Sequence, residues 1–442
     1  MANKSKGIFR FSKLRFIIFI IIAVVLGVSM LFSTQIENYY QQITGNVKVI
    51  SSTEILDNSK LSVHYVNVGQ GDCIMINLPD NKNMIIDAGQ KNGSKPIYSN
   101  QTESNDVAIT NHVINYAKAN IIKEGEKFDY MVLTHAHEDH VSILDNILEE
   151  FEVGTIVRSP EFYQNDEKDA VLTAKEKTLA DSIGVTLKKD YNITKTNTMR
   201  AFLNNAYAEV DLGATMLVTN DTIQFSGTDD EGNEYKVKFY TIDTNEYYNP
   251  TVGGLKSNPN NYSPLIILTY KQFSFAFTGD GEKESEKMIL QKYGTLPNVD
   301  FMDLAHHGSK TGNISEFIEA LDPEYAIVAV GKHEIYGLPD EEVYERLKQH
   351  DAEILNRIFE TIKYGDIVIG LNYTPSENAG SQEGETLASG ANMAIGISSG
   401  EYVPQTVIKW WYIALGLIVL SAIILFLAPK TSKKVIKKMS KK

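Results

Sequence analysis

The heptapeptide THAHEDH, residues 134–140, follows an apolar run that is typical of a β-strand. Along an extended chain His135 and His137 point the same way, because successive side chains alternate between the two sides of a strand. A turn after them brings Asp139 and His140 to face the same space. Zn²⁺, Fe and Mn all accept imidazole and carboxylate ligands. The motif therefore predicts a metal site at a strand end, and four ligands in one loop indicate two metal ions.

A less specific interpretation of this stretch is a polar strand-to-helix loop in which Asp139 caps the helix. The whole chain has only nine histidines, and three of them stand within these seven residues. Such a concentration disfavours an ordinary loop and favours metal binding.

Two further clusters of potential ligands follow apolar runs later in the chain. Asp280 comes directly after the run FSFAFTG (273–279), and His306 and His307 follow a strand-like run at 300–305. Five of the nine histidines thus fall in the first and last clusters, which makes Asp280 a candidate bridging ligand. With the choice between the last two left open, the candidate metal ligands are His135, His137, Asp139, His140, Asp280, His306 and His307.

The apolar pattern around these clusters predicts two strand-rich halves, at 61–87 and 215–279, each accompanied by helices. Such a pattern indicates two stacked mixed sheets with helices on the outside. The stretches with helical spacing are 106–122, 141–150, 170–183, 281–292, 313–320 and 340–349.

The motif HAHEDH resembles the HxHxDH signature of the metallo-β-lactamase superfamily, whose αββα fold holds one or two metal ions. The resemblance is closer to one branch, the metallo-β-lactamase-like domain of ComEC, the bacterial competence protein for DNA uptake. It covers roughly residues 61–372 and implies an α+β, αββα sandwich. The other matching motifs are VNVGQGDC (66–73), IIDAG (85–89), TGD (278–280), HHGSKT (306–311) and VGKHEIYGLP (330–339).

The chain departs from the pattern of this branch at several positions. No histidine lies between His140 and His306, so the third-histidine ligand that is common in β-lactamases has no candidate in that interval. A ligand from 306–307 must complete that coordination shell, or the shell stays open. Leu338 stands where the branch has a histidine, and His333 is either its substitute or a surface residue. Asn67 replaces the usual aspartate of the first motif. The multi-span channel of ComEC is missing, so we do not expect this chain to translocate DNA by itself.

The expected chemistry is hydrolysis by a metal-activated hydroxide, because two cations lower the pKa of a shared water. Asp280 bridges the ions in this scheme, and Asp139 ligates and orients the nucleophile. Ser309 and Lys310 are placed to meet an anionic substrate oxygen, although a capped helix start explains them equally well. We expect Asp72, Asp87, Gly69, Gly71 and Gly89 to shape the neighbouring loops, Cys73 to be a small buried residue, and Tyr336 to be a possible pocket residue.

The composition and charge of the chain exclude some classes of protein. The chain has 442 residues, 43% of them hydrophobic, and its single cysteine excludes an intramolecular disulfide. The net charge is −14, yet the tails 1–15 and 430–442 hold twelve basic residues and no acidic one. The chain between them is therefore strongly acidic, which disfavours tight nonspecific binding of nucleic acid.

Residues 16–36 and 410–428 carry no charged side chain, and each stretch is long enough to cross a bilayer as a helix. A cleaved signal peptide remains an alternative for the first stretch, and a buried soluble helix for either. The basic tails favour the cytoplasm. The expected order is basic tail 1–15, transmembrane helix 16–36, stalk 37–60, metallo-β-lactamase-like domain 61–374, Gly/Ser-rich linker 375–404, transmembrane helix 409–429 and basic tail 430–442.

These observations predict a two-pass membrane protein with cytoplasmic termini and an extracellular metal-dependent hydrolase domain. A phosphodiesterase or nuclease is favoured, with DNA or a phosphodiester-linked envelope polymer as substrate and two divalent ions, Zn or else Mn or Fe, as cofactors. The alternatives are a hydrolase of esters or lactams on the same fold and a non-catalytic metal-binding surface protein. The expected partners are the lipid bilayer and the phosphodiester substrate, and no protein partner is inferable.

Overall fold

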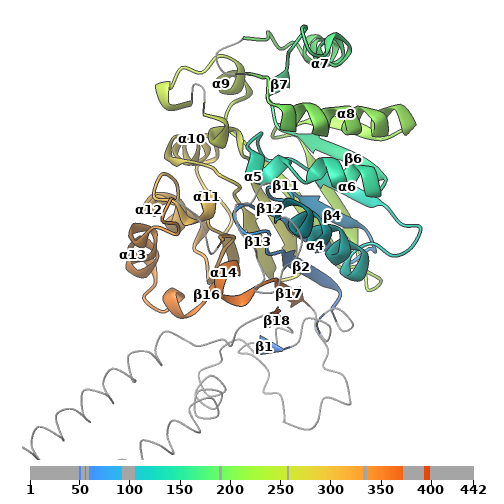
Figure 1. Ribbon diagram of the computed structural model, residues 1–442. Helices are drawn as coiled ribbons and strands as arrows, with labels where there is room; N and C mark the ends of the chain where they lie inside the picture. Colours follow the sequence, from blue (N-terminus) through green and yellow to red (C-terminus); the bar gives the residue numbers. More distant parts are fainter. Residues whose placement is uncertain are drawn as a thin grey trace, which may run out of the picture. The chain divides into compact units, whose positions relative to one another are not determined.

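The structure, a computed structural model, describes residues 49–50, 55, 59–91, 105–188, 192–255, 258–331, 336–371 and 393–398 (Figure 1). All of these residues belong to one compact unit, residues 47–402. The expected membrane-spanning stretches 16–36 and 409–429 and both basic tails lie outside the described residues. Within the described part of the chain, no helix combines the length and the apolar character needed to cross a membrane.

The first sheet has nine strands. Its centre, β2 to β4, is antiparallel, whereas β4, β5, β6 and β9 run parallel to one another. In spatial order its strands are β1 (Val49–Ile50), β18 (Met393–Ile397), β17 (Ile367–Leu371), β2 (Leu61–Tyr65), β3 (Ile74–Asn77), β4 (Asn83–Ile86), β5 (Phe128–Val132), β6 (Val153–Arg158) and β9 (Thr215–Val218).

The second sheet has seven strands and changes from antiparallel pairing to parallel pairing at β13. Parallel strands bring their carboxyl ends to one edge, so the loops after β13 and β14 are neighbours. In spatial order its strands are β10 (Gln224–Thr228), β11 (Glu234–Tyr240), β12 (Leu265–Tyr270), β13 (Phe273–Phe277), β14 (Phe301–Asp303), β15 (Tyr325–Val328) and β16 (Ile358–Glu360).

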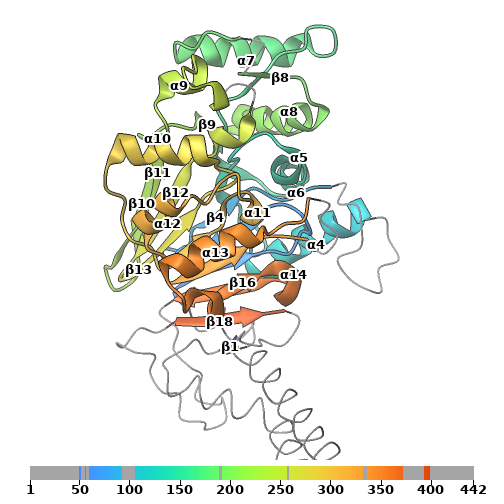
Figure 2. The same ribbon diagram turned by 90° about the vertical axis from the view of Figure 1, so that its left-hand side faces the viewer.

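Helices cover the outer face of each sheet (Figures 1 and 2). On the first sheet these are α4 (Asn105–Asn120), α6 (Leu144–Glu150) and α8 (Asn197–Leu212), and on the second they are α10 (Lys283–Tyr293), α12 (Ser315–Leu321) and α13 (Glu341–His350). The remaining elements are α5 (Glu138–Val141), β7 (Phe162–Tyr163), α7 (Ala170–Ser182), β8 (Ile193–Thr194), α9 (Thr244–Tyr248), η1 (Gly253–Leu255), η2 (Pro259–Tyr262), α11 (Ala305–Gly308), η3 (Ile354–Asn356) and α14 (Thr361–Tyr364).

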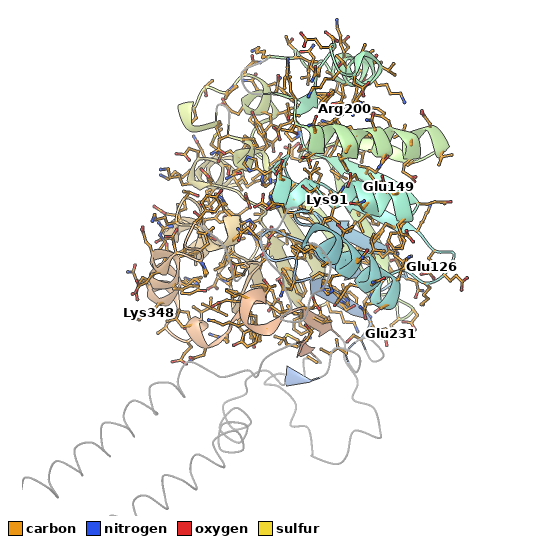
Figure 3. All side chains as sticks on the ribbon, in the orientation of Figure 1. Lys91, Glu126, Glu149, Arg200, Glu231 and Lys348 are labelled. Carbon is orange, nitrogen blue, oxygen red and sulfur yellow. The ribbon has the colours of Figure 1, made fainter. Side chains whose placement is uncertain are left out.

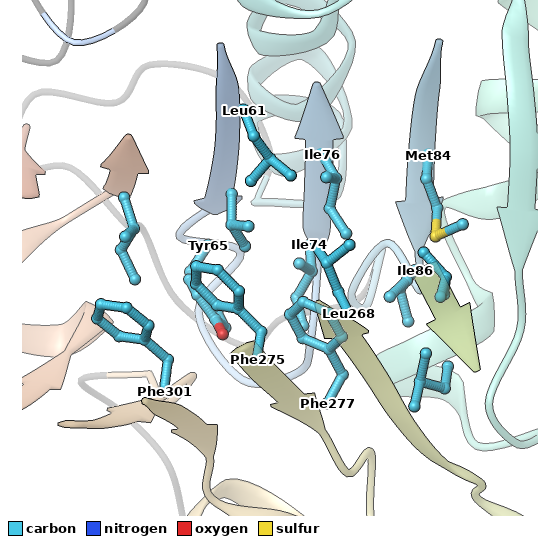
Figure 4. Packing of buried hydrophobic residues seen from close by; sticks show 14 of the residues in the cluster. Leu61, Tyr65, Ile74, Ile76, Met84, Ile86, Leu268, Phe275, Phe277 and Phe301 are labelled. Atoms are coloured by element: carbon cyan, nitrogen blue, oxygen red, sulfur yellow. The ribbon is translucent and has the colours of Figure 1, made fainter. Parts of the chain in front are cut away.

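The main core lies between the two sheets, where aliphatic side chains of β2 to β4 meet aromatic side chains of β13 and β14 (Figure 4). The Phe275 ring stacks on the Phe301 ring with centroids 4.7 Å apart. Charged residues such as Glu126, Glu231 and Lys348 are exposed at the periphery (Figure 3). The expected αββα sandwich is therefore confirmed.

Two boundaries differ from the sequence prediction. The run Met393–Ile397, inside the expected linker 375–404, forms β18 and pairs with β17 in antiparallel register. Val49–Ile50, inside the expected stalk 37–60, forms β1 and pairs with β18. Strand β18 is stabilised by burial of its apolar side chains, since Ala394 and Ile395 are almost completely buried. A five-residue apolar strand is hidden by the Gly/Ser-rich composition around it.

Candidate metal centre

The predicted strand-to-helix motif forms the first wall of the site. The chain leaves β5 at Val132, and His135 is completely buried, whereas His137 and Asp139 are partly exposed. His140 is buried in α5. The N-cap of α5 is His137 and makes no side-chain cap bond, so Asp139 does not cap this helix. The capping interpretation of the motif is thereby excluded.

The second wall comes from the loop after β13. Gly279 has a positive φ of 49°, and a Cβ on it would approach hydroxyl oxygens of Ser263 and Thr134 to 3.0 Å. Glycine is favoured at this position because a side chain would be strained by the positive φ and would crowd both hydroxyl groups. The tight turn leaves Asp280 only 1% exposed and aimed at the histidines of the first wall.

The third wall is α11, where two consecutive histidines adopt left-handed backbone conformations. The φ angles of His306 and His307 are 53° and 55°. His307 is 2% exposed, whereas the His306 side chain is 26% exposed. This unusual turn brings both imidazoles toward Asp280.

Asp280 lies at the centre, with its two carboxylate oxygens facing different histidines. Oδ2 is 3.5 Å from Nε2 of His135 and 3.7 Å from Nε2 of His306. Oδ1 is 3.0 Å from Nε2 of His140 and 3.5 Å from Nε2 of His307. Two compact groups of potential ligand atoms share this residue, namely His135–His137–Asp280 and Asp139–His140–Asp280–His307. Asp280 thus lies between the two groups, and its bridging of two ions stays a prediction.

Buried polar atoms without partners provide a direct test of whether a cation fits. Four buried atoms of the centre make no hydrogen bond among the described residues. They are Oδ1 of Asp280 and the Nε2 atoms of His135, His140 and His307. A buried polar atom without a partner costs about 1–3 kcal/mol. Four such atoms pointing into one space fit divalent cations, whose ligands they would be. The residues present therefore fit the expected metal pair.

The opposite ring nitrogens are held by other groups, as metal-ligating histidines require. Nδ1 of His140 lies 2.8 Å from Oδ2 of Asp87, and Nδ1 of His307 donates to the Ala329 carbonyl at 2.9 Å. Asp87 in turn accepts hydrogen bonds from the backbone and the hydroxyl of Thr134. Asp87, expected to shape a loop, thus also holds the ring of His140, one of the candidate ligands.

The protonation states of Asp280 and of the histidines around it depend on one another. Burial opposes ionisation of Asp280, but the neighbouring His140, His307 and His135 outweigh this effect and hold the pKa of its carboxyl well below the usual range. Burial lowers the pKa of His135 well below its usual value. Asp280 is thus held ionised and His135 neutral, as metal ligation requires of these two residues. Against the effect of burial, the Asp280 carboxylate raises the pKa of His140 and His307 well above the usual range, so a cation would have to displace those protons.

His306 stands at the edge of the two groups. Its Nδ1 lies 3.0 Å from Oγ1 of Thr311 and 3.5 Å from Oε1 of Glu282. Its Nε2 consequently faces Asp280 from the side of His135. His307 belongs to the second compact group, and His306 occupies the position that could complete the first.

The expected substrate residues have other partners in the structure. The ammonium group of Lys310 lies 3.1 Å from a carboxylate oxygen of Asp340, and the Lys310 backbone donates to the same side chain. The Ser309 hydroxyl is 3.0 Å from that of Thr311. Their contact with a substrate stays a prediction. Outside this loop, Cys73 is buried as expected, Tyr336 is 77% exposed, Leu338 is half-buried, and His333 lies outside the described residues.

Motif reasoning missed two supporting side chains. Ser263 contacts both His135 and the backbone of Asp280. The carboxylate of Glu161 accepts the N–H of Ala136, between the first two histidines, at 3.1 Å. Burial raises the pKa of Glu161 to about 7. Neither residue lies within a ligand cluster of the sequence, so no local signal identified them.

Residues 66–198 match the family model of the metallo-beta-lactamase superfamily. The chain carries a metallo-beta-lactamase superfamily domain. The chain is similar to ComE operon protein 3 of Bacillus subtilis (strain 168), with 25% identity over 304 residues, or 67% of this chain and 32% of that protein. The expected resemblance to ComEC-type competence proteins is thereby confirmed.

Shorter matches connect the chain to other bacterial proteins. Competence protein ComA of Neisseria gonorrhoeae is 35% identical over 96 residues, 22% of this chain and 14% of that protein. Recombination protein 2 of Haemophilus influenzae is 29% identical over 97 residues, 22% of this chain and 12% of that protein. The chain thus spans about a third or less of the length of these curated relatives.

Solved structures show more distant similarity. CmlA of Streptomyces venezuelae, described as a diiron beta-hydroxylase, is 12% identical, with a TM-score of 0.40 over 71% of this chain and 54% of that one. The metallo-beta-lactamase fold protein YhfI of Bacillus subtilis is 9% identical, with a TM-score of 0.33 over 70% of this chain and 98% of that one.

Proposed function

We propose that the chain is a membrane-anchored, extracellular metal-dependent hydrolase that cleaves phosphodiesters. The observation that carries the proposal is the position of Asp280, whose two carboxylate oxygens face two separate sets of imidazoles. Such a shared carboxylate suits two cations held side by side. Two-metal sites of this kind are used for hydrolysis of phosphate and acyl compounds.

Each residue of the centre has a distinct task in this proposal. His135 and His137 hold one divalent ion, with His306 beside them, while Asp139, His140 and His307 hold the other. When bound, the ions lower the pKa of a water and neutralise charge on the substrate. The least buried ligands are His137, Asp139 and His306, so substrate approaches from their side.

Phosphodiesters are favoured over other substrates for two reasons. Relatives of this chain are named for competence and recombination, which concern DNA. A phosphodiester also brings the negative charge that a metal pair neutralises, although the surrounding chain is acidic. The substrate is therefore DNA or a phosphodiester-linked envelope polymer, held mainly by the metal pair.

Membrane anchoring rests on the sequence. Two charge-free stretches, 16–36 and 410–428, are flanked on their outer sides by the basic tails. Basic tails stay in the cytoplasm. The domain between the two stretches is consequently placed outside the cell.

The test is turnover by the full-length chain loaded with Zn²⁺, Mn²⁺ or Fe²⁺. We expect hydrolysis of bis-p-nitrophenyl phosphate and of single-stranded DNA, and a loss of at least about a hundredfold in Asp139→Ala. Asp322→Asn, at an exposed left-handed turn, is the matched control and retains full turnover. Cleavage of p-nitrophenyl acetate or a lactam alone would contradict the phosphodiester assignment. Metal binding without any turnover would identify a binding protein.

A further inference from the structure

Ser263 connects the two sheets at the metal centre. It directly follows the short turn η2, which ends at Tyr262, and it is 3% exposed. Its Oγ lies 3.3 Å from Nδ1 of His135 and 3.2 Å from the backbone nitrogen of Asp280. One hydroxyl thus contacts a candidate ligand from the loop after β5 and another from the loop after β13.

The surrounding packing leaves this hydroxyl little freedom. Gly279 precedes Asp280, and a Cβ added to it would come within 3.0 Å of the hydroxyl oxygens of both Ser263 and Thr134. The turn that aims Asp280 is therefore closed against these two hydroxyl groups. Any movement of Ser263 would be transmitted to the Asp280 backbone.

The hydrogen bonds around His135 determine which ring nitrogen carries the proton. Thr134 uses its only hydroxyl proton for Asp87 Oδ2, 2.6 Å away, so toward Nδ1 of His135, at 3.1 Å, it can only accept. Ser263 Oγ accepts the N–H of Asp280 and keeps a second lone pair that can accept from the same Nδ1, 3.3 Å away. Because Thr134 can only accept, this arrangement favours the proton on Nδ1, with Ser263 as a second acceptor.

The other nitrogen of the ring is then free for ligation. Nε2 of His135 is buried, makes no hydrogen bond among the described residues, and lies 3.5 Å from Oδ2 of Asp280. We infer that Ser263 is a positioning residue of the metal centre, whose hydroxyl holds His135 in its Nδ1-protonated form and ties it to the backbone of the bridging carboxylate. The inference rests on the proposed metal centre and concerns the ion beside His135.

The experiment compares the full-length chain with Ser263→Ala, Ser263→Thr and Ser159→Ala. Ser159 is a matched control because it is also buried and its hydroxyl makes no hydrogen bond among the described residues. Zn²⁺ affinity is measured by competition with a chromophoric chelator, and the melting temperature of the metal-free protein is recorded in parallel. Outer hydrogen-bond partners of metal ligands typically contribute about 10–100-fold in metal affinity.

We expect Ser263→Ala to bind one ion like the wild type and the other about 10–100-fold more weakly. Its metal-free melting temperature should match that of Ser159→Ala, and Ser263→Thr, which keeps the hydroxyl, should recover the affinity. Binding of both ions by Ser263→Ala with the affinities of the wild type would overturn the inference. So would an affinity loss accompanied by an equal destabilisation of the metal-free protein, since that result indicates a structural role. A wild type that binds no Zn²⁺ would instead refute the metal centre itself.

Discussion

At the scale of single residues, the centre depends on side chains that hold other side chains. Asp87 illustrates this dependence, because it accepts two hydrogen bonds from Thr134 and lies 2.8 Å from Nδ1 of His140. Its carboxylate is completely buried. A change at Asp87 should therefore act on the metal through His140.

Asp87→Asn should lower metal affinity about 10–100-fold while leaving the ligands themselves in place. The amide is nearly the same size as the carboxylate but lacks the charge that fixes the tautomer of His140. Titration calorimetry with Zn²⁺ measures the effect, and Asp322→Asn serves as an exposed control. An affinity equal to that of the wild type would show that Asp87 only shapes its loop, as the sequence suggested.

From the raised pKa of Glu161 we predict that the free energy of unfolding depends on pH. Burial raises the pKa of its carboxyl to about 7 from the ordinary 4.5. The folded state therefore keeps a proton that the unfolded state has lost. The stabilising contribution is complete below about pH 4.5 and declines as the pH rises through about 7, by at most about 3 kcal/mol.

Denaturant unfolding of the metal-free protein between pH 5 and 8 checks this prediction against Glu161→Gln. The glutamine keeps an oxygen for the N–H of Ala136 but does not titrate. The unfolding free energy of the wild type should fall relative to that of the variant as the pH rises. Parallel curves would mean that Glu161 ionises normally in the folded protein.

At the scale of elements, most strands and helices with a strong apolar pattern could be predicted from the sequence, whereas contacts between distant elements could not. Strands β2 to β5 and β11 to β15 coincide with apolar runs, and their loops carry the ligand motifs. Helix α8 was not predicted, although Met199, Phe202, Leu203 and Ala206 form an apolar stripe at helical spacing along Asn197–Leu212. Spacing along the chain also could not show that Ser263, far from any motif, would reach His135, since that contact depends on the packing of two sheets.

Strand β18 gives a prediction of its own. Ile395 is completely buried in the core between the sheets and is paired with Ile369 of β17. Ile395→Ala should reduce the unfolding free energy by about 2–4 kcal/mol, since the lost side chain leaves a cavity. Val171→Ala, at a 72% exposed position on α7, should change it by less than about 0.5 kcal/mol. Equal stability of the two variants would restore the interpretation of residues 375–404 as a linker.

At the scale of the whole molecule, the proposal combines a metal-dependent domain with two membrane anchors. The basic tails predict that both termini stay in the cytoplasm while the acidic domain lies outside. Protease added to intact cells should therefore degrade an epitope inserted in the domain but spare epitopes at both termini. Protection of the domain epitope, with lysis restoring cleavage, would contradict this topology.

The central claim is that one chain holds two divalent ions through a shared Asp280. Elemental analysis of the full-length chain after Zn²⁺ loading and removal of free metal tests it most directly. We predict about two ions in the wild type and in Asp322→Asn, and at most one in Asp280→Asn, because both groups of ligands share that carboxylate. Two ions retained in Asp280→Asn, or at most one in the wild type, would contradict the claim.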